Sequence, residues 1–355
     1  MPKQVRHDVT HVMELNNLLR ENIKNLKPYS SARDEYSGDA MVFLDANENP
    51  FNEPYNRYPD PLQRLVKEKI AVLKKVDSES IFLGNGSDEP IDLLIRAFCE
   101  PGKDNVVTID PTYGMYKVAA DISGVELRKV SLTDDFQLNI NDILGETDKN
   151  TKLIFLCSPN NPTGNSLKKE AMLELANQFH GLVIVDEAYI DFAPGKTLMA
   201  ELEHYPNLVI LQTFSKAWGM AGIRLGMAFG SKELIGVLNK IKYPYNLNIL
   251  TQDKAMELLD KKVTVQKWVK LLIAEREKME KLLVEFPFVV KVYPSEANFL
   301  LVKMHDARGI YNYLVEEGII VRDRSKVHLC DESLRITIGN SEENENLLSA
   351  LKKLI

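Results

Sequence analysis

Residues 208–226 read LVILQTFSKAWGMAGIRLG, and this stretch indicates the fold. An apolar run typical of a buried strand leads directly to Lys216, although lysine is among the residues least often buried. A lysine in such a place usually lies at the strand exit, with its stem on apolar surface and its ammonium group in water. The rest of the sequence decides between this ordinary role and a chemical one.

The segment around this stretch, residues 81–230, alternates short apolar runs with helical patterns. The apolar runs are IFLG, VVTI, KLIFLC, LVIVDEAY and LVILQT, and they are separated by amphipathic segments such as IDLLIRAF and KKEAMLELANQF. Continuous apolar strands separated by helices are typical of a mainly parallel sheet covered on both faces. We therefore predict an α/β fold, with a large domain over residues 46–245.

The C-terminal part of the chain has a different pattern. The segment TVQKWVKLLIAEREKMEKLLVEF at residues 264–286 repeats its apolar residues every three or four positions, which predicts a long helix. Four short strands are predicted after it, in VVKVYPS, ANFLLVKM, GIIVRD and SLRITIG. We predict a smaller α+β domain over residues 246–355, and an N-terminal arm over residues 1–45, which are polar and weakly periodic.

Composition argues against several classes of function. The chain has 355 residues and a formal net charge of -7, without a lysine or arginine block, so nucleic acid is not an expected partner. No uninterrupted apolar run reaches the ~18 residues of a membrane span, and the first ten residues lack the apolar core of a signal peptide. The three cysteines lack zinc-site spacing. We expect a cytoplasmic protein with reduced cysteines, no metal and no membrane partner.

Ligands of open α/β sheets bind beyond the carboxyl ends of the strands, so the residues at those ends are candidate ligand contacts. In GNGSDEP, Gly86 and Ser87 lie between a strand and a helix, where free backbone N–H groups can bind an anion, although an ordinary tight turn is the alternative. Tyr113 in DPTYGMY could stack on a flat ring or cover the core edge. Asn161 in SPNNPTG could be a hydrogen-bond donor or part of a plain Asn-Pro turn.

Two later strand ends carry ionisable groups. Asp186 ends the apolar run LVIVD, so its carboxylate is expected to be desolvated and to need a cation. Tyr189 could place a phenol near the same ligand. Groups suited to a phosphate surround Lys216 in the sequence: Thr213, Ser215 and Arg224.

Together these groups fit one ligand, pyridoxal phosphate. Asp186 would keep the ring nitrogen protonated, Asn161 and Tyr189 would hydrogen-bond the ring oxygen, and Lys216 would form the Schiff base. This role answers the question raised by the lysine, because a Schiff-base nitrogen costs less to bury than a free ammonium group.

The motifs SPNNPTG, DEAY and SKAWGMAGIRLG, in this order, resemble those of the fold-type I pyridoxal-phosphate-dependent aminotransferases. A narrower resemblance, to the histidinol-phosphate aminotransferase family, spans residues 26–339 and rests on LKPYSSAR, LDANENP, NRYPD, GNGSDEPIDLLIRAF, DPTYGMY, GIIVRDR and SLRITIG. It implies exchange of the amino group between L-histidinol phosphate and 2-oxoglutarate in histidine biosynthesis. The products would be imidazole acetol phosphate and glutamate, formed by a ping-pong Schiff-base mechanism.

The resemblance also implies residue roles. Lys216 would be catalytic, supported by Asp186 and Tyr189. The remaining cofactor contacts would come from Gly86, Ser87, Asp88, Tyr113, Asn161, Thr213, Ser215 and Arg224. Tyr58, from NRYPD, would reach the cofactor of a neighbouring subunit, which implies a homodimer. The residues implied in substrate binding are Tyr29, Asn161, Arg322 and Arg335.

The two arginines suit both implied substrates, because a guanidinium group can bind a carboxylate or a phosphate in fork geometry. Arg322 could instead pair with Asp323 or another acid as a structural ion pair. Arg335 lies in the alternating strand SLRITIG, where an inward charge would need a partner.

Other functions remain compatible with the same cofactor site. An aromatic aminotransferase would use the same cofactor contacts, and a threonine-phosphate decarboxylase would also need arginines for a phosphate. A non-enzymatic pyridoxal-phosphate-binding regulator is a further class, but the sequence shows no appended basic or helix-turn-helix segment. A cofactor-free α/β binding protein would require every strand-end residue to be incidental.

Overall fold

The computed structural model describes residues 15–29 and 42–355. The predicted N-terminal arm falls partly on residues 1–14 and 30–41, which lie outside the described residues. Of the rest of the arm, Leu15 and Leu19 are buried in the core beside α5 (Asp88–Phe98), and the Lys240 ammonium group donates to the carbonyl of Ile23 at 2.6 Å. The two short helices here are α1 (Leu15–Leu18) and α2 (Glu21–Lys24).

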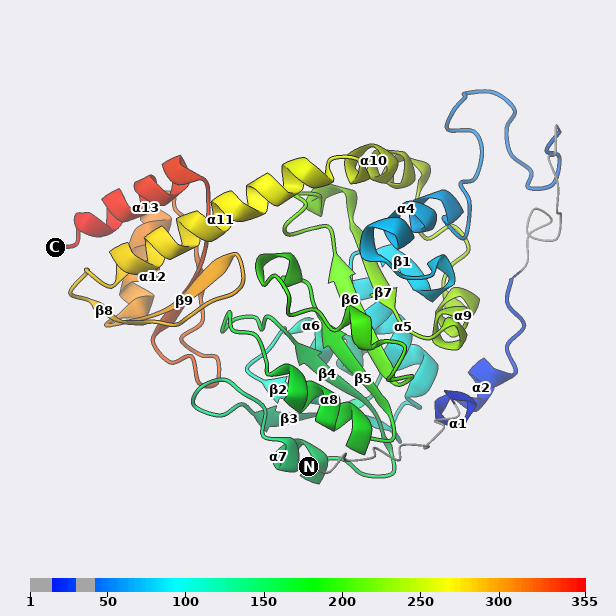
Figure 1. The fold of residues 1–355 in the computed structure, drawn as a ribbon, viewed down its shortest axis with the longest axis horizontal. Helices are drawn as coiled ribbons and strands as arrows, with labels where there is room; N and C mark the ends of the chain where they lie inside the picture. The colour runs from blue at the N-terminus through cyan, green and yellow to red at the C-terminus, as the bar shows by residue number, and fades with distance from the viewer. Residues whose placement is uncertain (1–14, 30–41) are drawn as a thin grey trace, which may run out of the picture.

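A seven-stranded sheet forms the centre of the molecule, with strand order β1-β7-β6-β5-β4-β2-β3 (Figure 1). All its neighbouring strands pair in parallel except that β7 is antiparallel to both β1 and β6. The predicted α/β fold with a mainly parallel sheet is therefore confirmed. Its strands are β1 (Ile81–Asn85), β2 (Asn105–Asp110), β3 (Glu126–Ser131), β4 (Thr151–Cys157), β5 (Leu182–Asp186), β6 (Leu208–Thr213) and β7 (Leu225–Phe229).

Two of these strands were not predicted. β3 lies at the sheet edge and is mostly polar, so it lacks the continuous apolar run of a central strand. β7 follows closely after Lys216 and contains Gly226, which lowers its strand propensity. Its antiparallel direction brings the chain back beside β1, and so carries Arg224 to the end of the first strand.

Helices cover both faces of the sheet. On one face α5, α6 and α9 pack against alternate residues such as Ile184 and Val209, and on the other α4, α7 and α8 pack against Val183 and Ile210. The burial of both faces explains why the central strands are apolar throughout. The bounds are α4 (Arg64–Lys74), α5 (Asp88–Phe98), α6 (Met115–Ile122), α7 (Ile140–Gly145), α8 (Lys169–Gln178) and α9 (Lys232–Ile241). Short 3-10 turns span Ser78–Ser80, Ile190–Phe192, Met199–Glu201 and Ala221–Ile223.

The C-terminal part contains a second, antiparallel sheet with strand order β10-β11-β9-β8. The long helix α11 runs from the large sheet to this smaller one (Figure 1). A separate core, with Leu300, Leu314 and Leu348 among its members, lies between the small sheet and its helices. The domain boundaries given above stay a prediction. The elements are α10 (Ile249–Leu259), α11 (Lys262–Leu283), β8 (Val289–Val292), β9 (Phe299–Met304), α12 (Ala307–Glu316), β10 (Arg322–Asp323), β11 (Ser333–Thr337) and α13 (Ser341–Lys352).

The described residues also bear on metals and membranes. Cys99, Cys157 and Cys330 are free and buried. Within residues 15–29 and 42–355, no group of three His, Cys, Asp or Glu side chains could hold a metal ion. No helix in that part of the chain is long and apolar enough to cross a membrane.

Candidate active site

The predicted cofactor residues gather at the carboxyl ends of the central strands. Ten of them line one cavity of about 150 Å³: Gly86, Ser87, Asp88, Tyr113, Asp186, Tyr189, Thr213, Ser215, Lys216 and Arg224. A neighbouring cavity of about 840 Å³ shares Tyr113, Tyr189 and Lys216 with it. Asn161, Arg322 and Arg335 line this second cavity. Because Lys216 lines both cavities, we treat them as one site.

The small cavity has an anion-binding end at the N-terminus of α5. The Gly86 N–H donates to the carbonyl of Arg224 at 2.9 Å, and Gly86 has a φ of +72°. A Cβ atom at Gly86 would lie 2.6 Å from Arg224 Nη2, and one at Gly226 would lie 2.2 Å from the backbone nitrogen of Ser87. Glycine at both positions therefore lets the guanidinium group and the helix N-terminus converge.

Hydroxyl groups complete this end of the cavity. Ser87 is the N-cap residue of α5, and its side chain makes no capping hydrogen bond. The Thr213 hydroxyl donates to Ser215 Oγ at 3.0 Å, which holds the two side chains together. Arg224 Nη2 is 3.8 Å from Asp88 Oδ2, and both side chains are substantially exposed, so this ion pair is weak. The arrangement of donors fits the phosphate of a cofactor.

Asp186 forms the buried floor of the cavity and is 2% exposed. The Tyr116 hydroxyl donates to its Oδ2 at 2.8 Å, and the Ala188 N–H donates to its Oδ1 at 3.0 Å. Burial raises the pKa of Asp186 to about 6, against the lowering effect of these two hydrogen bonds. A ligand with a ring cation would restore the lost solvation, which is the role predicted for this carboxylate.

Sequence reasoning missed Tyr116. It is fully buried and stacks on Phe155 with ring centroids 4.9 Å apart, while its hydroxyl reaches Asp186. The motif DPTYGMY contains this residue, but only Tyr113 was singled out there. Spacing offers a signal, because residues three apart at the start of a helix lie on neighbouring turns. Tyr113 itself donates to Asp88 Oδ1 at 3.0 Å.

The Lys216 side chain lines the cavity and is exposed, so it is not packed into the core. Its Nζ lies 5.7 Å from the ring centroid of Tyr189. The surrounding protein removes water from the ammonium group and so lowers the pKa of Lys216, and the nearby charge of Arg335 lowers it further. A lysine amine with a lowered pKa is suited to nucleophilic attack and to proton transfer near neutral pH.

A hydrogen-bonded chain joins the small sheet to the cofactor cavity. Arg335 Nη1 donates to Asn161 Oδ1 at 2.6 Å, and Asn161 Nδ2 donates to the Tyr189 hydroxyl at 3.3 Å. Burial lowers the pKa of Arg335, which is the inward charge expected in β11. The larger cavity, which the predicted substrate residues Asn161, Arg322 and Arg335 line and which is called the substrate cavity below, is therefore joined to the residues that would contact the cofactor ring.

Arg322 lies beside Arg335 across the β10–β11 pair, where the two residues are partners in register. The alternative in which Arg322 pairs with Asp323 is not what the structure shows, because Asp323 Oδ2 accepts from Arg308 at 2.7 Å. The guanidinium group of Arg322 therefore remains available at the cavity.

Arg324 is a third arginine of the same cavity, and sequence reasoning missed it. Its Nε is buried and has no hydrogen-bond partner. Burial lowers the pKa of Arg324 to about 10, and the charges of Arg335 and Arg322 add to the effect. The alternation in GIIVRDR carries the signal, since residues two apart in an extended chain point to the same side.

Two predicted residues lie away from these cavities. Tyr58 is 51% exposed and stacks on Tyr245 with ring centroids 4.4 Å apart. Tyr29 is 69% exposed. Neither lines the cofactor cavity or the substrate cavity of its own chain. Their predicted roles stay predictions.

Comparison with known proteins identifies the family. Residues 39–351 match the sequence model of the family described as aminotransferase class I and II, and the chain belongs to this family. It is 60% identical to the histidinol-phosphate aminotransferase of Parabacteroides distasonis over 96% of this chain and 99% of that protein. The corresponding protein of Cytophaga hutchinsonii is 53% identical over 95% of this chain and 98% of its own length.

Solved structures agree with this family. The histidinol-phosphate aminotransferase of Clostridium acetobutylicum superposes with a TM-score of 0.78 at 26% identity, covering 84% of this chain and 91% of that one. The L-threonine-O-3-phosphate decarboxylase of Porphyromonas gingivalis has a TM-score of 0.71 at 22% identity, covering 84% and 91%, and this likeness concerns the fold alone. The chain is thus an enzyme of a pyridoxal-phosphate-dependent family, and the donor set described above fits that cofactor.

Replacing Tyr116 with phenylalanine should shift the pH dependence of cofactor binding. In the wild type the hydrogen bond from the Tyr116 hydroxyl lowers the pKa of Asp186. Without that hydroxyl the pKa should rise by on the order of one unit. Asp186 attracts a ring cation only when ionised, above its pKa. The decline of pyridoxal phosphate affinity on acidification should therefore begin at a higher pH in Tyr116→Phe than in the wild type.

The measurement is the dissociation constant of pyridoxal phosphate across the pH range from 5 to 8, a window about the Asp186 pKa of about 6. Tyr113→Phe is the matched control, because it removes a phenol that donates to Asp88 and not to Asp186. Superimposable pH profiles for Tyr116→Phe and the wild type would contradict the role of Tyr116.

Proposed function

We propose that this enzyme transfers the amino group of L-histidinol phosphate to 2-oxoglutarate, forming imidazole acetol phosphate and glutamate in histidine biosynthesis. The observation that carries the proposal is the cationic cavity joined to Lys216, in which Arg322, Arg324 and Arg335 gather. Both substrates of this reaction are anionic, L-histidinol phosphate through its phosphate and 2-oxoglutarate through its carboxylates. The 60% identity to proteins named histidinol-phosphate aminotransferase supports the same substrate.

The residues at the cofactor end would hold pyridoxal phosphate by its phosphate, its ring nitrogen and its ring oxygen. When bound, this cofactor supplies an aldehyde for the substrate amine and a protonated ring that accepts electrons. Asp186 would hold the proton on the ring nitrogen, and Tyr189 and Asn161 would orient the ring oxygen. The phosphate would meet the N-terminus of α5, the Ser215 hydroxyl and Arg224.

Lys216 would move the proton in the transfer of the amino group. Burial lowers the pKa of Lys216, which increases the share of unprotonated amine that can accept a proton from the substrate carbon. Arg335 would anchor an anionic substrate group while it bonds Asn161, so the substrate and the ring would be aligned by one hydrogen-bonded chain.

A homodimer in the cytoplasm is part of the proposal. The exposed Tyr58 stacks on Tyr245, and neither residue lines the two cavities that meet at Lys216. The proposed role of Tyr58 is to reach the cofactor of the second subunit, as the family resemblance implies. Tyr29 is proposed to contribute to the substrate pocket, as the family resemblance implies.

Arg324 is proposed as a substrate-binding residue in addition to Arg322 and Arg335. Burial and then the charges of Arg335 and Arg322 lower the pKa of Arg324, and burial and the charge of Arg322 lower the pKa of Arg335. The guanidinium groups therefore repel one another, and a bound anion relieves the repulsion. A phosphate dianion carries more charge than a carboxylate, so it gains more from the third guanidinium group.

The proposed reaction is tested by measuring glutamate formed from L-histidinol phosphate and 2-oxoglutarate with purified holoenzyme. We expect turnover by the wild type and its loss in Lys216→Ala, which should still bind cofactor through the remaining contacts. Carbon dioxide release from phosphothreonine without an oxo acid would instead favour the decarboxylase. Faster turnover of aromatic amino acids than of L-histidinol phosphate would favour the aromatic aminotransferase.

Arg324→Ala should selectively reduce kcat/KM for the substrate that carries a phosphate. We expect kcat/KM for the half-reaction of L-histidinol phosphate to fall about tenfold or more, the cost of a lost charged hydrogen bond. The glutamate half-reaction should fall less. Lys326→Ala is the matched control, because Lys326 lines the same cavity but is exposed. Equal losses for both substrates, or a larger loss in Lys326→Ala, would refute the role of Arg324.

A further inference from the structure

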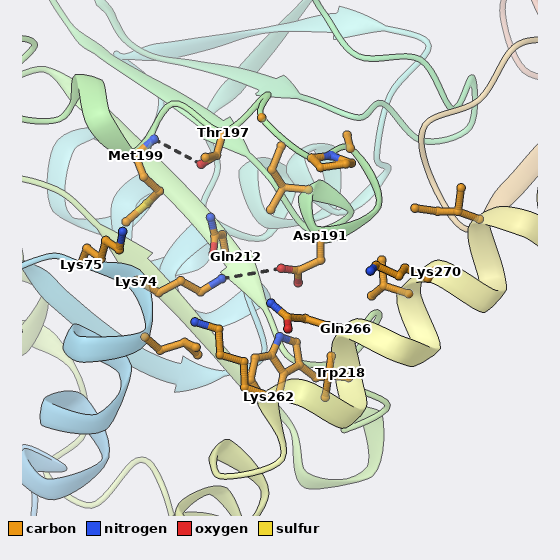
Figure 2. Close-up of a pocket in the computed structure, with 18 residues that line it drawn as sticks. Lys74, Lys75, Asp191, Thr197, Met199, Gln212, Trp218, Lys262, Gln266 and Lys270 are labelled. Atoms are coloured by element: carbon orange, nitrogen blue, oxygen red, sulfur yellow. Dashed lines mark hydrogen bonds and ion pairs between the residues drawn. The ribbon is translucent and has the colours of Figure 1, made fainter.

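A separate cavity of about 570 Å³ lies between α11, the C-terminal end of α4 and the loop that follows β5 (Figure 2). Its lining residues include none of those that line the cofactor and substrate cavities. A hollow of this size is within the range that small organic ligands occupy in proteins. The proposed reaction assigns it no role.

Strand β6 separates this cavity from the active site. Successive residues of a strand point to opposite faces, so Gln212 faces the cavity while Thr213 faces the cofactor end. Trp218 in the cavity wall is two residues from Lys216, and Ile190 follows Tyr189 directly. The cavity thus lies behind the active site and shares its supporting segments.

Gln212 presents an unsatisfied acceptor here. The side chain is 3% exposed, and its Nε2 donates to Glu187 Oε2 at 2.8 Å. The Glu187 carboxylate also accepts from the Thr197 hydroxyl and the Leu198 N–H, so the amide nitrogen of Gln212 faces Glu187. The remaining atom, Gln212 Oε1, is buried without a hydrogen-bond partner. A buried acceptor of this kind favours a ligand with an N–H or O–H group.

Lysines surround the same cavity. Lys262 and Lys270 lie with Gln266 on one side of α11, at successive spacings of four residues, and Lys75 lies at the end of α4. Figure 2 shows Lys74, Lys262 and Gln212 extending into the same space. The one carboxylate in the lining, Asp191, is 3.9 Å from Lys74.

The charge of this lining is therefore unbalanced. Among the residues that the structure describes, Lys75, Lys262 and Lys270 form no ion pair. In a chain with a net charge of -7, such a group of lysines around a hollow favours an anion. The wall between the lysines is apolar and aromatic, with Trp218, Val265, Val269 and Ile273.

We propose that this cavity is a second ligand site for a small amphipathic organic anion, with a carboxylate or phosphate group, an apolar body and an N–H or O–H donor. The anionic group would lie among the lysines, the body would lie against Trp218 and the valines of α11, and the donor would reach Gln212 Oε1. The site is independent of the substrate chosen by the active site.

The test uses 4-hydroxybenzoate as the probe, because it has a carboxylate, a ring and a hydroxyl donor. Trp268→Phe holoenzyme leaves Trp218 as the single tryptophan of the chain, so its fluorescence reports on the cavity wall. We expect a saturable change in fluorescence. Benzoate, which lacks the donor, and methyl 4-hydroxybenzoate, which lacks the charge, should each bind more weakly.

Variants separate this cavity from the active site. Lys262→Ala combined with Lys270→Ala should reduce the affinity for the probe about tenfold, the effect of losing about 1.4 kcal/mol. Lys267→Ala, an exposed position of the same helix outside the lining, should have no effect. Arg335→Ala should also leave binding unchanged, since that residue belongs to the substrate cavity. Calorimetry on the wild-type chain repeats the titration without the tryptophan replacement.

Three results would overturn the proposal. One is the absence of saturable binding in both fluorescence and calorimetry. Another is binding of the neutral ester as tight as that of 4-hydroxybenzoate, which would show an apolar cavity that does not recognise the anionic group. The third is loss of binding in Arg335→Ala with none in the double lysine variant, which would place the probe in the active site.

Discussion

The burial of the Asp186 carboxylate at the end of β5 is the constraint on which the candidate active site depends. An ionised carboxylate removed from water needs either a cation or neutralisation, and its pKa of about 6 reflects this conflict. The Tyr116 hydroxyl and the Ala188 N–H replace part of the lost solvation of the carboxylate. A cation in direct contact with the carboxylate would complete the site, and the ring of pyridoxal phosphate supplies one.

The same loss of solvation acts on Lys216 with the opposite sign. Burial favours the neutral form of each group, so it raises the pKa of the acid and lowers that of the amine. An acid and a base whose pKa values move toward neutrality in one cavity are typical of a catalytic site. The parallel strands matter here because they bring both residues to one edge of the sheet, although Asp186 and Lys216 are thirty residues apart in the chain.

The sequence predicted those parts of the structure that depend on local pattern. The apolar runs around Val183 and Ile210 are continuous because both faces of the sheet are covered, and the strand-end residues follow from where these runs stop. β7 was missed because Gly226 weakens its own strand signal, so its strand structure depends on pairing with β1 and β6. Tyr116 and Arg324 were missed for a related reason, since their roles depend on contacts made across the fold. The cavity behind β6 combines α4, α11 and a loop, which no single motif brings together.

The central claim is that Lys216 and its neighbours form a pyridoxal phosphate site that accepts the amine of L-histidinol phosphate. The most direct test is the visible absorption spectrum of the holoenzyme before and after addition of L-histidinol phosphate, with no oxo acid present. The account predicts that the absorbance of the lysine-bound cofactor disappears and that the amine form of the cofactor replaces it. A spectrum left unchanged by L-histidinol phosphate would contradict the proposed substrate, and a protein that gains no visible absorbance from added cofactor would contradict the site itself.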